Sequence, residues 1–190
     1  MNKHAKYFLK LASTFDPALV NLSAHSLQPL AVYNQRQLCG QRAVSQFKNY
    51  EDVPATTFVA PTIIKEQLLR YLPKELLRLE LPELWVMNIT PESANSYLPA
   101  HRDKTRLCSV NFYMDTHSEE TAYYQLERRR LIRMGSFVAH SGEIWVLNSD
   151  EIHDVKLSYP YTRKSLGFSF LSTPFDTVRG IYERSMSLES

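Results

Sequence analysis

Short segments in which apolar and polar residues alternate follow one another through the second half of the chain. This period of two predicts β-strands with one buried face, because successive side chains on a strand point to opposite sides. The expected strands cover residues 84–89, 109–114, 122–126, 131–134, 142–147, 153–155 and 163–169. Turn residues separate several of them, as at Thr90-Pro91 and Ser141-Gly142. Short strands divided in this way predict two facing antiparallel sheets.

Two other stretches have the longer period of a helix. Leucine and isoleucine recur at helical spacing through residues 63–79, and Pro73 divides them into one or two helices. We expect this stripe to pack on the sheet rather than to bind a partner protein. A closing helix is predicted after Pro174, followed by a loose end at residues 186–190. Its apolar face consists of Phe175, Val178, Ile181 and Tyr182.

The N-terminal segments carry weaker signals. Residues 5–13 match a short amphipathic helix, which would support the sheet from outside. Asp16 directly precedes Pro17, which is the arrangement of a helix cap and a first helical residue, and this second helix would reach residue 22. Residues 57–64 are rich in β-forming residues and are interrupted by Pro61.

Composition indicates one globular domain. The 190 residues, with 44% hydrophobic residues, are enough for a sizeable core. The net charge of +2 is too small to predict nucleic-acid or membrane binding. No apolar run approaches the roughly 18 residues of a membrane span, and no signal peptide is apparent. Cys39 and Cys108 are far apart and suggest no disulfide framework, so we expect a reduced, cytoplasmic compartment.

The strongest chemical signal is His101-x-Asp103 followed at a distance by His153. Two histidines and one carboxylate can form a facial triad, which binds Fe(II) on one face and leaves the opposite positions open. Ten residues after His153 comes Arg163, whose guanidinium is suited to a carboxylate. On the last strand Ser165 shares a face with Arg163. The remaining histidines have no ligand partner at useful spacing and are expected to be surface or structural residues: His4, His25, His117 and His140.

Residues 84–171 resemble the Fe(II)- and 2-oxoglutarate-dependent oxygenase superfamily. The segments 106–114 and 153–170 are similar to the prolyl-hydroxylase branch. Gly142-Glu143-Ile144-Trp145, followed by Asn148 and His153, resembles aspartyl/asparaginyl hydroxylases and small free-amino-acid hydroxylases. The resemblance implies a mainly β fold with flanking helices, a double-stranded β-helix of the jelly-roll, cupin-like type. A single domain over 1–190 is then expected, with an N-terminal helical or mixed support region (1–83), the core (84–171), and a C-terminal helix and tail (172–190).

The resemblance also implies roles. His101, Asp103 and His153 would bind Fe(II), to which 2-oxoglutarate and dioxygen would be added. Arg163 would pair with the distal carboxylate of 2-oxoglutarate, assisted by Ser165, and Tyr113 or Asn111 would bond the same carboxylate. Asn88 and Tyr97 are further candidates for contact with the co-substrate, or else order loops. Because Asp103 is retained, the resemblance favours hydroxylation over halogenation, while desaturation and cyclisation use the same ligands.

Three functions stay open at this point. The favoured one is a dioxygenase that hydroxylates an amino acid, either a small molecule or a residue of a peptide or protein. The second is an oxygenase of a nucleobase or another metabolite. Its basic rim would consist of Arg102, Lys104, Arg106 and Arg128-Arg129-Arg130. We interpret the triple arginine instead as the solvated edge of a hairpin, since no nucleic-acid module is present. The third is a non-catalytic binding module of the same fold. The sequence specifies neither the substrate nor the oligomeric state.

Overall fold

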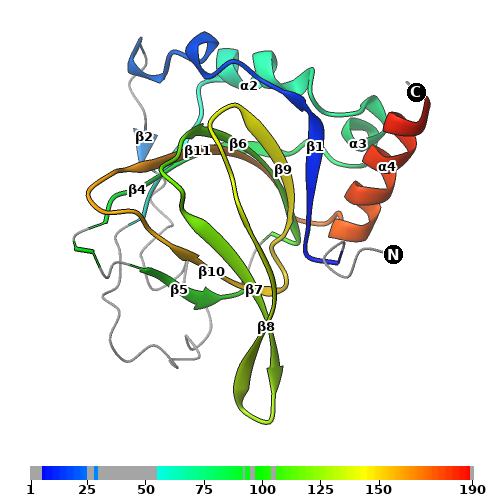
Figure 1. Cartoon of the computed structure of the whole chain (residues 1–190). Coiled ribbons are helices and arrows are strands. Elements are labelled where there is room, and N and C mark those ends of the chain that lie inside the picture. Colours follow the sequence, from blue (N-terminus) through cyan, green and yellow to red (C-terminus); the bar gives the residue numbers. More distant parts are fainter. Residues whose placement is uncertain are drawn as a thin grey trace.

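Two antiparallel sheets face each other in the computed structural model, which describes residues 6–24, 28–29, 55–91, 93–94, 97–103 and 106–188 (Figure 1). The larger sheet has the strand order β1-β9-β6-β11-β4-β3-β2, and the smaller sheet has the order β5-β10-β7-β8. The strands are β1 (Phe8–Thr14), β2 (Gln28–Pro29), β3 (Ala55–Val59), β4 (Glu83–Ile89), β5 (Tyr97–His101), β6 (Cys108–Asp115), β7 (Glu120–Glu127), β8 (Arg130–Val138), β9 (Glu143–Asn148), β10 (Ile152–Lys156) and β11 (Arg163–Phe170). The predicted mainly β architecture of two antiparallel sheets is confirmed.

Strand β6 shows how the alternation in the sequence produces two different faces. Cys108, Val110 and Phe112 are fully buried in the main apolar core, between the larger sheet and the helices. Ser109 and Asn111 point the other way and line a pocket between the two sheets. The larger sheet is therefore apolar toward its helices and polar toward the pocket, as the sequence pattern predicts.

Within the described residues, three helices cover the outer face of the larger sheet: α2 (Thr62–Leu69), α3 (Lys74–Leu79) and α4 (Phe175–Leu188) (Figure 1). The leucine stripe faces the core as expected, since Ile64, Leu68, Leu72 and Leu76 are all at most 4% exposed. Pro73 separates α2 from α3, as predicted. The closing helix is confirmed but is longer than expected, because residues 186–188 are helical rather than loose. None of the helices among the described residues is long and apolar enough to cross a membrane.

The N-terminal prediction of a helix over residues 5–13 is wrong. Residues 8–14 form strand β1, which pairs antiparallel with β9 at the edge of the larger sheet. Leu11 is its only fully buried side chain, and the neighbouring residues are half-buried or exposed. A segment with so few apolar positions fits the period of a helix as well as that of a strand. Pairing with β9 therefore decides its conformation. The N-terminal region therefore contributes strands to the sheet as well as supporting helices.

The two elements that follow differ in detail from their predictions. The Asp16 side chain is a helix N-cap, as expected, and accepts a hydrogen bond from the backbone N–H of Ala18 at 2.9 Å. It caps a short 3-10 helix, η1 (Pro17–Leu19), and a second one follows, η2 (Leu22–Ala24). Strand β3 ends before Pro61, and α2 begins directly after this proline.

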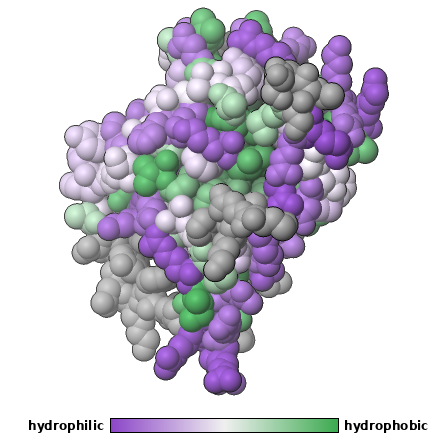
Figure 2. Space-filling view, turned by 45° about the vertical axis from the view of Figure 1, so that its right-hand side comes forward, coloured by the Kyte–Doolittle hydropathy of each residue, from purple (hydrophilic) through white to green (hydrophobic). Residues whose placement is uncertain are grey.

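The triple arginine lies at the tip of the β7–β8 hairpin, which projects from the body of the molecule (Figure 1). Residues 125–130 are all exposed, and this lower end of the molecule is largely hydrophilic in the space-filling view (Figure 2). Pairing of Glu127 with Arg130 leaves a two-residue turn in which Arg128 and Arg129 have φ of 45° and 69°. The hairpin and its exposed edge are as predicted. Arginine, however, adopts the left-handed backbone conformation of these two turn positions only at an energetic cost.

Replacing the turn by Asn-Gly (Arg128→Asn, Arg129→Gly) is therefore expected to stabilise the protein. Asn and Gly adopt positive φ at little cost, so the free energy of unfolding should rise by about 1 kcal/mol. Urea denaturation of the wild type and the double variant measures the change. Arg130→Asn, which removes a charge from the adjacent strand position, is the control and should give no gain. An unchanged or lower stability of the Asn-Gly variant would contradict the turn conformation.

Candidate metal centre

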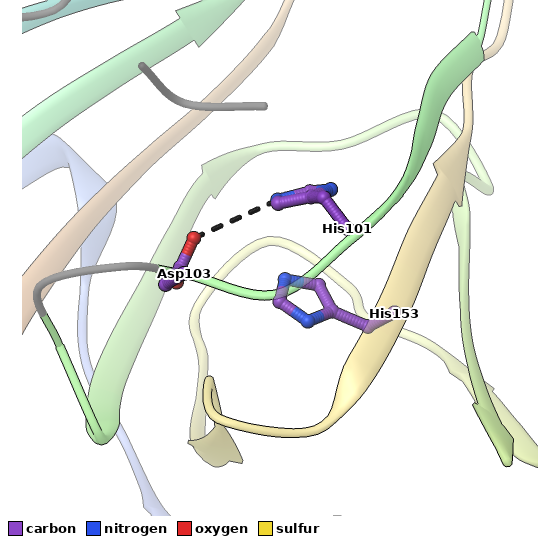
Figure 3. A group of neighbouring side chains, drawn as sticks. All are labelled: His101, Asp103 and His153. Carbon is purple, nitrogen blue, oxygen red and sulfur yellow. Dashed lines mark ion pairs between the residues drawn. The ribbon is translucent and has the colours of Figure 1, made fainter. Parts of the chain in front are cut away.

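The three predicted metal ligands come together at β10 and at the end of the neighbouring strand β5. His101 ends β5 and is the direct register partner of His153 on β10. Their ring centroids are 4.5 Å apart. Asp103 lies just beyond β5, where its backbone N–H donates to the carbonyl of Ser149 at 3.0 Å. One potential ligand atom from each of the three side chains lies within 4.8 Å of the others, in the arrangement drawn in Figure 3.

His153 is held in the form that a metal requires. Its Nδ1 lies 2.9 Å from the carbonyl oxygen of Glu151. A carbonyl only accepts, so Nδ1 carries the proton and Nε2 keeps its lone pair for a metal. Burial, together with the neighbouring His101, lowers the pKa of His153 to about 4. The imidazole is therefore neutral at physiological pH and competes little with protons for a metal ion.

Asp103 is kept ionised although it is buried. Burial by itself raises the pKa of this carboxyl, but the charge of Arg106 and the contact with His101 outweigh it, so the pKa lies well below its usual range. The Nε of Arg106 donates to Asp103 Oδ2 at 2.5 Å, while His101 Nε2 lies 3.6 Å from Oδ1. Two imidazole nitrogens and one carboxylate are the donor set that suits Fe(II) with open coordination positions.

The pocket beside these ligands contains most of the other predicted site residues. It lies between the sheets, and its walls come from both of them and from two connecting segments. The lining residues are Met87, Ile89, Leu98, His101, Asp103, Arg106, Ser109, Asn111, Thr121, Leu147, Ser149, His153, Val155, Arg163 and Ser165. Two polar atoms on the wall, Asn111 Oδ1 and Thr121 Oγ1, are buried without a hydrogen-bond partner among the described residues. Such orphaned groups are rare in folded proteins and indicate a pocket suited to a polar ligand.

Arg163 stands at the start of β11 and is only 6% exposed. Its Nη2 donates to the hydroxyl of Tyr113 at 3.1 Å, and Tyr113 is the register partner of Ser165. An apolar cluster that includes Ile89, Leu98 and Val155 adjoins this end of the pocket. The guanidinium is thus placed in a water-poor environment, where an ion pair with a ligand carboxylate is strong.

The remaining candidates are placed differently. Asn88 lies on the opposite face of β4 from Met87 and Ile89, as the partner of Lys164, and does not line the pocket. The side chain of Tyr97 lies outside the described residues, as do His4, His25, Cys39 and Lys104. His117 lies 3.0 Å from an oxygen of Asp115 and stacks on Tyr161, away from the triad. The fully buried Cys108 belongs to the core.

Sequence reasoning missed two residues beside the ligands. Arg106 is assigned above to a basic rim, but it is buried and ion-paired with Asp103, so this assignment is wrong. Tyr123, from β7, is fully buried and its ring centroid lies 5.5 Å from that of His153. Within the part of the chain that the structure describes, its hydroxyl has no hydrogen-bond partner. The only feature of the sequence that could have indicated the ion pair is the position of Arg106 three residues after Asp103. Nothing in the sequence distinguishes Tyr123 from Tyr124.

The metal-free protein should become less stable as the pH falls from about 6.5 toward 4. His153 has a pKa of about 4 in the fold and an ordinary value of 6.5 when unfolded, so only the unfolded chain takes up a proton in this range. The stabilisation is complete above pH 6.5, and a loss on the order of 3 kcal/mol is expected by pH 4. Urea denaturation across this range measures it. His153→Gln should flatten the dependence, whereas His140→Gln should not; equal slopes in the wild type and His153→Gln would contradict the assignment.

No protein-family model and no curated protein matches the sequence. Solved structures do match. A prolyl-4-hydroxylase from Pseudomonas putida is 16% identical, with a TM-score of 0.54 over 90% of this chain and 96% of that one. HygX from Streptomyces hygroscopicus, with nickel and 2-oxoglutarate bound, is 11% identical, with a TM-score of 0.54 over 90% and 86% of the two chains. A 2OG-Fe(II) oxygenase-family oxidoreductase from Burkholderia pseudomallei is 14% identical, with a TM-score of 0.51 over 85% and 84%.

The chain has the fold of the 2OG-Fe(II) oxygenases. Within this oxygenase fold it also carries the His-x-Asp and distal His triad with converging ligand atoms. The residues present fit both groups that the fold implies. The triad offers the nitrogen and oxygen donors of a ferrous site, and the buried Arg163 on the same pocket wall offers a cation for the second carboxylate of a dicarboxylic acid.

Proposed function

We propose that this chain is an Fe(II)- and 2-oxoglutarate-dependent dioxygenase that hydroxylates an unactivated C–H bond of an amino acid, free or within a peptide or protein. The observation that carries the proposal is that one pocket is lined both by the metal triad and by the buried Arg163. A metal site alone would suit many functions. A second, cationic subsite in the same pocket is what a co-substrate with two acidic ends requires.

The chemistry would come from the bound groups, and the protein would supply placement. Loaded with Fe(II), 2-oxoglutarate and dioxygen, such a site puts one oxygen atom into the substrate C–H bond and the other into succinate, with release of carbon dioxide. His101, Asp103 and His153 would hold the metal, with the Glu151 carbonyl fixing the tautomer of His153. Arg163 would hold the distal carboxylate, and Tyr113 and Ser165 would orient it. The apolar residues around Arg163 would exclude water.

Hydroxylation of an amino acid is favoured by the resemblance of the motif segments to prolyl and aspartyl/asparaginyl hydroxylases. The similarity in fold to a prolyl-4-hydroxylase agrees with it. Retention of Asp103 favours hydroxylation over halogenation. A second candidate is a different small metabolite, because HygX has also been solved with nickel, 2-oxoglutarate and hygromycin B bound. Binding without catalysis is the third.

The test is a screen of iron-loaded protein with 2-oxoglutarate under air. Free amino acids, peptides covering each side chain, nucleosides and aminoglycosides are supplied in parallel, and products are analysed by mass spectrometry. A product heavier by one oxygen from an amino acid or peptide supports the proposal. The same gain on a nucleoside or an aminoglycoside selects the metabolite function. Absence of both succinate and oxidised product would assign a binding role.

A further inference from the structure

The two oxygens of the Asp103 carboxylate have different surroundings. Oδ2 accepts the hydrogen bond from Arg106 Nε at 2.5 Å, whereas Oδ1 lies on the side of His101 Nε2, at 3.6 Å. The side chains of Asp103 and Arg106 are only 7% and 10% exposed. In such a site a charged hydrogen bond is strong and orients both partners. The carboxylate therefore presents one oxygen to the histidines and the other to the arginine.

The surroundings of Arg106 are shaped to hold its guanidinium in this position. Its Cζ lies 5.9 Å from the ring centroid of Trp85 on β4. On the neighbouring strand β11, a Cβ at Gly167 would lie 4.0 Å from Arg106 Nη1 and 2.8 Å from Asn111 Oδ1. The missing side chain at Gly167 thus leaves the space that Asn111 occupies beside the guanidinium. Arg106 is part of the pocket and not a surface cation.

A carboxylate can bind a metal ion through one oxygen or through both. Binding through both takes one more coordination position, and this position would be lost to other ligands. In a facial triad the open positions are those that a chelating co-substrate and dioxygen would need. A hydrogen bond that engages Oδ2 prevents the second mode and leaves only Oδ1 available.

We propose that Arg106 is a positioning residue that restricts Asp103 to one metal-ligating oxygen and so keeps a coordination position open for the co-substrate. The identity of that co-substrate rests on the proposed function, whereas the effect on the metal site does not. Arg106→Gln removes the charge and the Nε–H, and it frees Oδ2 to bind the metal. Metal binding should therefore survive, but the metal environment should change. The affinity of the metal-loaded protein for 2-oxoglutarate should fall by about 10- to 100-fold.

The experiment uses Co(II), whose visible absorption depends on coordination number and geometry. Spectra of Co(II)-loaded wild type, Arg106→Gln and Arg106→Lys are recorded, and each protein is then titrated with 2-oxoglutarate. Arg106→Lys keeps the charge without the Nε–H geometry and should lie between the other two. Arg102→Gln is the matched control, because Arg102 is a neighbouring but half-exposed arginine, and it should behave as the wild type.

An altered Co(II) spectrum together with weakened 2-oxoglutarate binding in Arg106→Gln, and intermediate values in Arg106→Lys, would support the proposal. A wild-type spectrum and wild-type affinity in Arg106→Gln would overturn it. If circular dichroism shows that Arg106→Gln does not fold, the Co(II) spectrum and the 2-oxoglutarate affinity of Arg106→Lys test the proposal instead. Wild-type values of both in Arg106→Lys would overturn it. If the wild type binds Co(II) but not 2-oxoglutarate, the proposed function fails, while the comparison of the spectra still decides the role of Arg106.

Discussion

Replacing Arg163 by alanine is expected to weaken 2-oxoglutarate binding to the metal-loaded protein by roughly 30- to 5,000-fold. The loss corresponds to about 2–5 kcal/mol, the cost of leaving a buried carboxylate without its partner. Arg163 is buried and lies on the pocket wall, where the Tyr113 hydroxyl accepts one of its hydrogen bonds. Metal ligands can hold only the keto-acid end of a five-carbon diacid, so its other end requires a cation farther along the pocket.

Two further variants make this result specific. Arg163→Lys keeps a charge without the planar fork of a guanidinium, so it should raise the apparent KM for 2-oxoglutarate and leave metal binding intact. Lys164→Ala is the matched control, because Lys164 follows Arg163 on β11 but points to the opposite face. Calorimetric titration measures 2-oxoglutarate binding by all three variants, and succinate formation at varied 2-oxoglutarate concentration gives the KM. Undiminished binding by Arg163→Ala would show that another residue holds the distal carboxylate.

The second large effect is expected at the metal ligands. The wild type should bind one divalent ion per chain, and the double variant His101→Ala/His153→Ala should bind none at the same free metal concentration. Only the Asp103 carboxylate would then remain of the three converging ligands, and a single carboxylate holds such ions weakly in water. Elemental analysis after dialysis against Mn(II) or Ni(II) gives the stoichiometry.

The control for this measurement is His117→Ala, which removes a histidine paired with Asp115 and stacked on Tyr161. Its metal content should equal that of the wild type. Equal metal content in the double variant and the wild type would contradict the assignment of the triad.

The predictions made from the sequence agree with the structure where a residue's position depends on strand alternation and order along the chain. His101 and His153 lie on paired strands, and the alternation of side chains along these strands directs both toward the pocket that Arg163 and Ser165 also line. The alternation in β6 likewise separated the core side chains from those facing the pocket. These features follow from the period of two, which is set by local geometry.

The predictions failed where pairing between distant segments decides the outcome. Residues 8–14 became a strand because β9 offers them an edge, which their own composition does not reveal. Arg106 looked like one of several basic residues near Asp103, and only the packing of β4 and β11 around it places it inside. The helix α4 continues to Leu188, past the last of its four core-facing residues. Long-range contacts of this kind are not encoded in the periodicity of one segment.

The most direct test of the dioxygenase proposal follows the oxygen atoms. Iron-loaded wild type is incubated with 2-oxoglutarate and the amino acids and peptides of the screen under ¹⁸O₂ in ordinary water, and the succinate formed is analysed by mass spectrometry, with His101→Ala/His153→Ala as the blank. The proposed dioxygenase should give succinate that carries one ¹⁸O atom and depends on both histidines and Fe(II). Absence of succinate above the blank, or succinate without the label, would contradict it.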